Sequence, residues 1–120
     1  MQSIIDHAIT SDIEVCGFVT VENGELKTEP AKNIASYKDD IFEIHPLEVI
    51  RQIKSGKLAA IYHTHPVTEE AESNFDKFNC ENSCIPYLIY SKKTKKFNLL
   101  VPQKPHVNKQ YIEMLRKMYD

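Results

Sequence analysis

The chain of 120 residues has the size of one ordinary domain, and 42% of its residues are hydrophobic, which is enough to form a core. Its formal net charge of −2 and isoelectric point near 6.2 give no basic surface to follow phosphates, so nucleic acid is not an expected partner. No apolar run approaches the roughly 20 residues that span a bilayer, and residues 1–12 lack the features of a signal peptide. We therefore expect one domain over residues 1–120, not associated with a membrane, in the cytoplasm.

The three cysteines favour a reducing compartment over a disulfide framework, because their number is odd and Cys16 lies in an apolar, strand-like run. Cys80 and Cys84 are four residues apart and would share one face of a helix. A second metal site there would need two more ligands, and none stands nearby at a familiar spacing. We interpret both as small, partly buried thiols.

The first half of the chain predicts two helices and four short strands. Apolar residues recur at helical spacing near the N-terminus, and Asn23-Gly24 is a strong hairpin signal. Pro46 suits the first residue of a helix that Gly56 would end. The helices are expected at residues 2–10 and 46–56, and the strands at 14–20, from residue 26, at 33–37 and at 41–44.

The second half predicts a buried strand followed by helix, strand, strand and helix. Residues 58–62 (LAAIY) form a continuous apolar run, typical of a central strand that is covered on both faces. The last helix would place Ile112, Leu115 and Met118 on one apolar stripe. The lysine-rich segment 92–96 is interpreted as a solvated turn. The later elements are expected at residues 73–82, 86–91, 97–101 and 108–119, and the whole order predicts an α/β domain with helices against a mixed sheet.

The stretch from His63 to Asp76 (HTHPVTEEAESNFD) carries the residues with recognisable chemistry. Residues two apart on a strand project to the same face, so His63 and His65 can converge on one ion. Ser73 and Asp76 are three apart, which places them on one face of a helix. Two imidazoles and a carboxylate, with the fourth position left to water, are a ligand set of catalytic zinc.

Each half of this pattern also fits a structure without metal. Two histidines that flank a threonine fit an ordinary strand end. Ser73-x-x-Asp76 fits a helix capping box, with serine at the N-cap and an acid three residues on. Their combination within 14 residues favours the metal site, and a cap would also fix Ser73 at its mouth.

A zinc hydrolase also needs a general base. H-E-x-x-H enzymes place theirs between the two histidines, where this chain has Thr64. Glu14 is the best candidate, because a carboxylate at the head of a buried strand can be held rigidly and partly desolvated. The alternatives are the three glutamates of the acidic segment 67–72, which we interpret as a solvated loop: Glu69, Glu70 and Glu72.

Taken together, these residues resemble the signature of the JAMM (JAB/MPN) metalloprotease family. That signature is an E-x-C-G strand, later H-[ST]-H-P, and then S-x-x-D, whose serine is the eighth residue after the second histidine. The segment 80–91 is similar to the one that follows the motif in bacterial and phage-tail members, although Cys84 stands where a glycine is common. The matching positions here are Glu14, Cys16, Gly17, His63, His65, Pro66, Ser73 and Asp76.

The resemblance implies a mixed sheet sandwiched by helices, related to the cytidine deaminase fold. It implies zinc bound by His63, His65 and Asp76, with Glu14 polarising the attacking water and Ser73 helping to hold the oxyanion. The implied reaction is hydrolysis of an amide or isopeptide bond in a protein or peptide, including ubiquitin-like conjugates. The similarity to phage-tail members of the family implies tail proteins as partners, in the bacterial host cell or on the virion.

Two other functions fit the sequence less well. A catalytically silent MPN-type scaffold, acting as a tail-assembly interaction protein, would keep the fold and lose the ligands, whereas here the full set of five site residues is intact. Zinc-dependent base deamination would require an H-x-E motif with a P-C-x-x-C pair, and neither is present. The expected function is therefore a zinc-dependent peptidase or isopeptidase.

Overall fold

The computed structural model describes residues 2–9, 15–35, 42–65 and 74–119. Within these ranges, the helices and strands that form follow the order expected from the sequence, with boundaries that move by one to a few residues, and the two strands expected at 33–37 and 41–44 are not found. The elements are α1 (Gln2–Ile9), β1 (Cys16–Glu22), β2 (Glu25–Ala31), α2 (Pro46–Ser55), β3 (Leu58–His65), α3 (Asn74–Ser83), β4 (Tyr87–Ser91), β5 (Lys96–Leu100) and α4 (Lys109–Tyr119). None of the described helices is long and apolar enough to cross a membrane.

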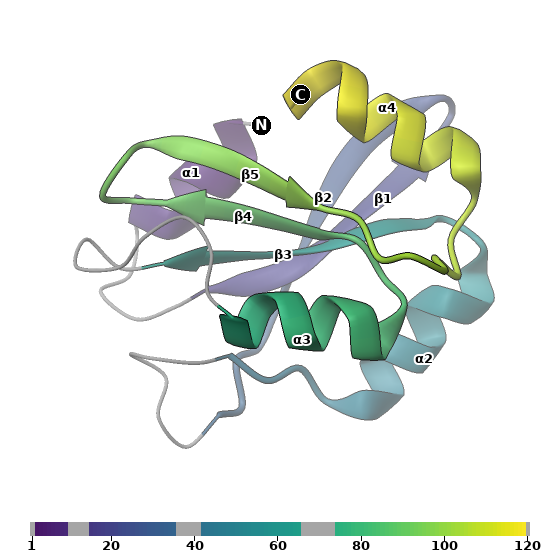
Figure 1. Ribbon diagram of the computed structural model, residues 1–120, viewed down its shortest axis with the longest axis horizontal. Coiled ribbons are helices and arrows are strands. Elements are labelled where there is room, and N and C mark those ends of the chain that lie inside the picture. Colours follow the sequence, from purple (N-terminus) through teal and green to yellow (C-terminus); the bar gives the residue numbers. More distant parts are fainter. Residues whose placement is uncertain (1, 10–14, 36–41, 66–73, 120) are drawn as a thin grey trace.

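The strands form one five-stranded mixed sheet in the order β2-β1-β3-β4-β5 (Figure 1). β3 and β4 are parallel, and the other neighbouring pairs are antiparallel. A parallel pair needs a crossover connection, and α3 lies on the connection between these two strands. Every residue of β3 is buried, which confirms the central, doubly covered strand predicted from its apolar run.

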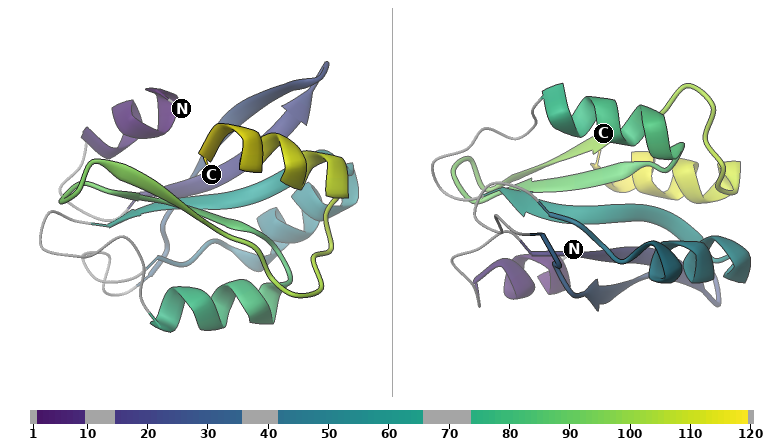
Figure 2. Two further views of the ribbon diagram at one scale, coloured as in Figure 1. Left: turned by 45° about the horizontal axis from the view of Figure 1, so that its top comes forward. Right: turned by 90° about the horizontal axis from the view of Figure 1, so that it is seen from below.

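Helices cover both faces of the sheet, α1 and α4 on one face and α2 and α3 on the other (Figures 1 and 2). Alternate residues of β3 enter the two resulting cores. Tyr62 packs into the core with α1 and α4, and Ile61 packs into the core with α3. Since His63 and His65 have the same parity as Ile61, their side chains project towards the α3 face. The expected sandwich of helices around a mixed sheet is confirmed.

The turn and cap signals of the first half are confirmed by backbone geometry. Asn23 and Gly24 have φ of 52° and 77°, as a two-residue type I′ hairpin turn requires. The α2 helix begins at Pro46 after His45, whose Nδ1 accepts a hydrogen bond of 3.1 Å from the Leu47 N–H. The helix is capped at its C-terminal end by Gly56, whose φ is 71°.

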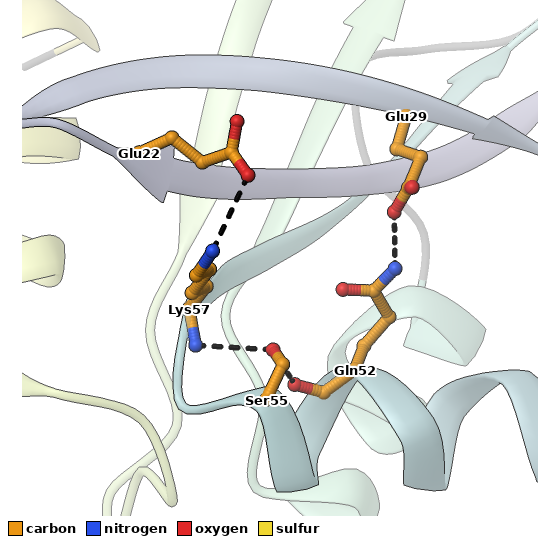
Figure 3. A network of polar contacts seen from close by, with 5 residues as sticks. All are labelled: Glu22, Glu29, Gln52, Ser55 and Lys57. Carbon is orange, nitrogen blue, oxygen red and sulfur yellow. Dashed lines mark hydrogen bonds and ion pairs between the residues drawn. The ribbon is translucent and has the colours of Figure 1, made fainter.

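A polar network joins the β1–β2 hairpin to the end of α2 (Figure 3). The Ser55 hydroxyl donates to the Gln52 carbonyl at 2.6 Å and accepts from the Lys57 N–H at 3.1 Å. The Lys57 ammonium lies 3.4 Å from the Glu22 carboxylate, and the Gln52 side-chain amide donates to Glu29. Because these side chains are exposed, the network orients the helix end and adds little stability.

The two strands expected at 33–37 and 41–44 are absent from the described part of these segments. Residues 33–35 and 42–44 are not in strands, and residues 36, 37 and 41 lie outside the described ranges. The Asn33 Oδ1 accepts from the N–H groups of Ala35 at 3.1 Å and Glu43 at 3.0 Å, and the Ile34 N–H donates to the Glu43 carbonyl at 2.8 Å. A side chain that satisfies backbone donors in this way stabilises a loop in place of a ladder.

The last helix buries a different stripe from the one predicted. Ile112 and Leu115 are buried as expected, whereas the Met118 side chain is 57% exposed. Tyr119 instead packs on the core, with its ring centroid 4.9 Å from that of Phe97. The buried positions are therefore spaced by three and four residues.

The two neighbouring cysteines are thiols that belong to no metal group among the described residues. Cys80 is buried, its thiol donates to the Ile85 carbonyl at 3.4 Å, and burial raises its pKa to about 12. Cys84 is partly buried and adopts φ of 59°, in the left-handed region, where α3 ends. Glycine suits that conformation best, so the departure noted at this position places a strained residue at the helix terminus.

We expect Gly17→Ala to destabilise the protein strongly, because an added Cβ would lie 2.4 Å from the Tyr62 ring and 2.5 Å from the Glu29 carbonyl oxygen. Over-packing usually costs about 1–3 kcal/mol, and the backbone obstacle cannot rotate away, so a loss of about 3 kcal/mol or more is expected. Urea unfolding measures it. Gly56→Ala is the control, since only its positive φ opposes a side chain there. An equal or smaller loss for Gly17→Ala would contradict the packing explanation.

Candidate metal centre

Three polar side chains meet on the α3 face of the sheet, inside an otherwise apolar layer. His63 and His65 are the third-last and last residues of β3, and Asp76 lies in the first turn of α3. Their exposed fractions are 0%, 4% and 3%. Buried imidazoles and a buried carboxylate are costly unless they pair with one another or bind an ion. The structure thus brings together the three residues predicted as metal ligands.

The Asp76 carboxylate bridges the two imidazoles. Its Oδ1 lies 2.9 Å from His63 Nε2, and its Oδ2 lies 2.7 Å from His65 Nε2. Burial alone raises the pKa of Asp76, but the hydrogen bonds and charges of the two histidines outweigh burial and hold its pKa well below the usual range. The carboxylate is therefore ionised, as a metal ligand must be.

Aromatic rings fix the orientation of His63. The Phe42 ring stacks on it, with centroids 4.4 Å apart and an interplanar angle of 25°. The Tyr87 ring meets it edge-on, with centroids 5.8 Å apart. Neither contact is predicted by the sequence pattern. The signal for Tyr87 is its register, because it pairs with Ile61, two residues before His63, and so belongs to the same face of the sheet.

Hydrogen bonds from both neighbouring strands fix the end of β3. The Thr64 hydroxyl accepts from the Val15 N–H at 3.2 Å, and the Thr64 N–H donates to the Val15 carbonyl at 3.0 Å. On the other side the Lys92 N–H donates to the His65 carbonyl at 3.2 Å. Thr64 therefore has a structural role between the two histidines that the sequence pattern did not reveal. The turn predicted at 92–96 is found at residues 92–95, where 93–95 are exposed, and Lys96 begins β5.

The two residues predicted to act in catalysis, Glu14 and Ser73, lie outside the described residues. Glu14 directly precedes Val15, which is hydrogen-bonded to Thr64. Ser73 directly precedes Asn74, the first residue of α3. Both residues are therefore direct chain neighbours of residues that surround the centre.

The three side chains fit a metal ion. One ligand atom from each lies within 4.8 Å of the others, and no other group of three or more such side chains is found in the described residues. Ligands bound at about 2.0–2.2 Å to one ion are at most about 4.4 Å apart, so small adjustments suffice. His65 Nδ1 is buried without a hydrogen-bond partner among the described residues. Two imidazoles favour a transition metal over calcium or magnesium, which prefer oxygen ligands.

The chain is similar to a phage protein in part of its sequence and to a solved structure over most of its fold. No family model matches it. Over 78 residues, 65% of this chain, it is 27% identical to the tail tip assembly protein K of Escherichia phage N15, and the match spans 32% of that relative's length. The solution structure of protein DSY2949 from Desulfitobacterium hafniense superposes with a TM-score of 0.54 at 16% identity, covering 92% of this chain and 95% of that one. The latter likeness shows that the two chains share a fold.

Asp76→Asn should weaken zinc binding by about 100-fold or more. Mutating residues that only orient the ligands already lowers metal affinity by about 10–100-fold, and loss of a ligand should cost at least as much. The affinity is measured by competition with a fluorescent chelator. Glu81→Gln is the matched control, since it makes the same carboxylate-to-amide change on the same helix at an exposed position. Unchanged affinity in Asp76→Asn would show that Asp76 is not a ligand.

Proposed function

We propose that this chain is a zinc-dependent peptidase or isopeptidase of the JAMM (JAB/MPN) type. The observation that supports it best is the convergence of His63, His65 and Asp76, all buried, at the end of the central strand. These are the positions at which the sequence resembles the metal ligands of that family. The sheet with helices on both faces is the architecture that the resemblance implies.

Zinc in such a site lowers the pKa of its water to about 7 and polarises a carbonyl. In our proposal Glu14 accepts the proton of the attacking water and passes it to the leaving amine. The chain path supports this role. Consecutive Cα atoms are about 3.8 Å apart. Val15, the residue after Glu14, is hydrogen-bonded to Thr64, which lies between the two histidines.

Ser73 is proposed to donate a hydrogen bond to the oxyanion that develops on the scissile carbonyl. It directly precedes the start of α3 and lies three residues before Asp76, so one helix end would carry both a ligand and the oxyanion donor. A donor aimed at developing charge in a site that excludes water is a large contribution in amide hydrolysis.

The similarity to a tail tip assembly protein supports a role in phage tail assembly. We propose tail proteins as substrates or partners, with the chain acting in the infected cell or on the virion. A ubiquitin-like conjugate is the other substrate class that the resemblance implies. The relative is named for assembly and not for cleavage, so a silent scaffold that binds tail proteins is the second candidate.

Glu14→Gln should retain the fold and the metal but lose about 10²–10⁴-fold in hydrolysis, because glutamine has nearly the same shape and cannot accept the proton. Hydrolysis is followed by mass spectrometry on a peptide library with the zinc-loaded protein. Glu22→Gln is the control, since it makes the same change at the exposed far end of β1.

Wild-type rates in Glu14→Gln would assign the base elsewhere, first among Glu69, Glu70 and Glu72. If the zinc-loaded wild type cleaves no peptide in the library and no isopeptide conjugate, the scaffold is favoured. Metal analysis of each variant separates loss of chemistry from loss of the ion.

A further inference from the structure

A cleft of about 560 Å³ opens on the α3 face of the sheet, the face to which His63 and His65 project. Its lining comes from α3, α2, β3, β4, residue 35 and the segment 42–44 that precedes α2. Its volume lies within the range of about 300–1,000 Å³ that is usual for ligand pockets. The larger apolar and aromatic side chains of the lining are Phe42, Ile44, Val49, Ile61, Phe75 and Tyr87.

The cleft shares a wall with the metal centre. Phe42 and Tyr87 line it, and both rings also contact His63, at centroid distances of 4.4 and 5.8 Å. Phe75, on the α3 side, is the residue next to Asp76 in the chain. A group seated in the cleft is therefore separated from the metal ligands by a single layer of side chains.

The chemistry of the lining selects an apolar group. Among the described lining residues Glu43 is the one charged side chain, and it is exposed. Asn79 and Ser83 add neutral hydrogen-bonding groups along α3. Phe75 is 54% exposed, so an occupant would remove part of a phenyl ring from water.

Resting on the proposed function, we propose that this cleft binds a large apolar side chain, aromatic or branched aliphatic, of the substrate residue beside the bond to be cleaved. An acidic side chain is disfavoured by Glu43, and a small one would leave the cleft unfilled. Such a pocket fixes the scissile amide relative to the metal ligands and so limits cleavage to sites with a bulky apolar neighbour. The occupant is thereby defined as part of an extended polypeptide with such a residue.

The test uses the zinc-free protein and a small amino-acid derivative, so that binding is separated from hydrolysis. N-acetyl-phenylalanine amide is titrated into the ¹⁵N-labelled, zinc-free full chain and followed by amide chemical shifts, with the alanine and lysine analogues as comparisons. We expect shifts at Asn79 and Ser83 and at least fivefold tighter binding of the phenylalanine probe. Equal affinities, or shifts centred on the separate cleft beside Ile9 and Tyr90, would overturn the proposal.

Two exposed phenylalanines on α3 provide a matched pair of variants. Phe75 lines the cleft, and Phe78, which is 65% exposed, does not. Phe75→Ala should weaken probe binding about tenfold and Phe78→Ala less than twofold, whereas Val49→Trp should fill the cleft and abolish binding. Equal effects of the two alanine variants would overturn the proposal. Probe binding by this chain, together with no cleavage of any library peptide or isopeptide conjugate by its zinc-loaded form, would contradict the peptidase function and leave the cleft assignment standing.

Discussion

The Asp76 carboxylate, ionised and buried between His63 and His65, is the interaction on which the α3 face of the protein depends. Removing any one of these three side chains would destabilise the protein by several kcal/mol, because the remaining groups would then be buried charges or donors without partners. The pair of contacts therefore fixes where α3 starts relative to the end of β3. It also explains why a strand buried along its whole length tolerates polar residues at one end. Departures from an apolar core of this kind are typical of sites kept for function.

The residues that support this interaction come from both halves of the chain. β1 pairs antiparallel with β3, so that Cys16 lies opposite His63 and Gly17 lies opposite Tyr62. Gly17 allows the Tyr62 ring to approach the backbone, and Val15 bonds to the residue between the histidines. Residues 16–17 and 62–63 are far apart in sequence and lie side by side on paired strands. A change in either would displace the same strand end.

Local signals in the sequence were sufficient for most of the fold and for the convergence of the three candidate ligands. The hairpin, the limits of α2 and the buried β3 each depend on short-range patterns, and the spacing of His63, His65 and Asp76 follows from strand and helix periods. What could not be predicted depends on contacts distant in sequence. Phe42 belongs to the segment 41–44, which its sequence predicts as a strand, but its ring stacks on His63 in a loop stabilised by Asn33. The cleft beside it is lined by several separate elements, and no single segment carries a signal for it.

Asp76 lies on a helix and its two partners lie on a strand, so an ion bound by the three side chains would couple its binding to the docking of α3. The same helix supplies Phe75, Asn79 and Ser83 to the neighbouring cleft. An ion and a cleft occupant would both stabilise one arrangement of α3 on the sheet, so each would raise the affinity for the other by the same factor. Under the proposed function, the protein would be most selective when loaded with metal, and loss of the ion would loosen the α3 wall of the cleft as well as removing the proposed chemistry.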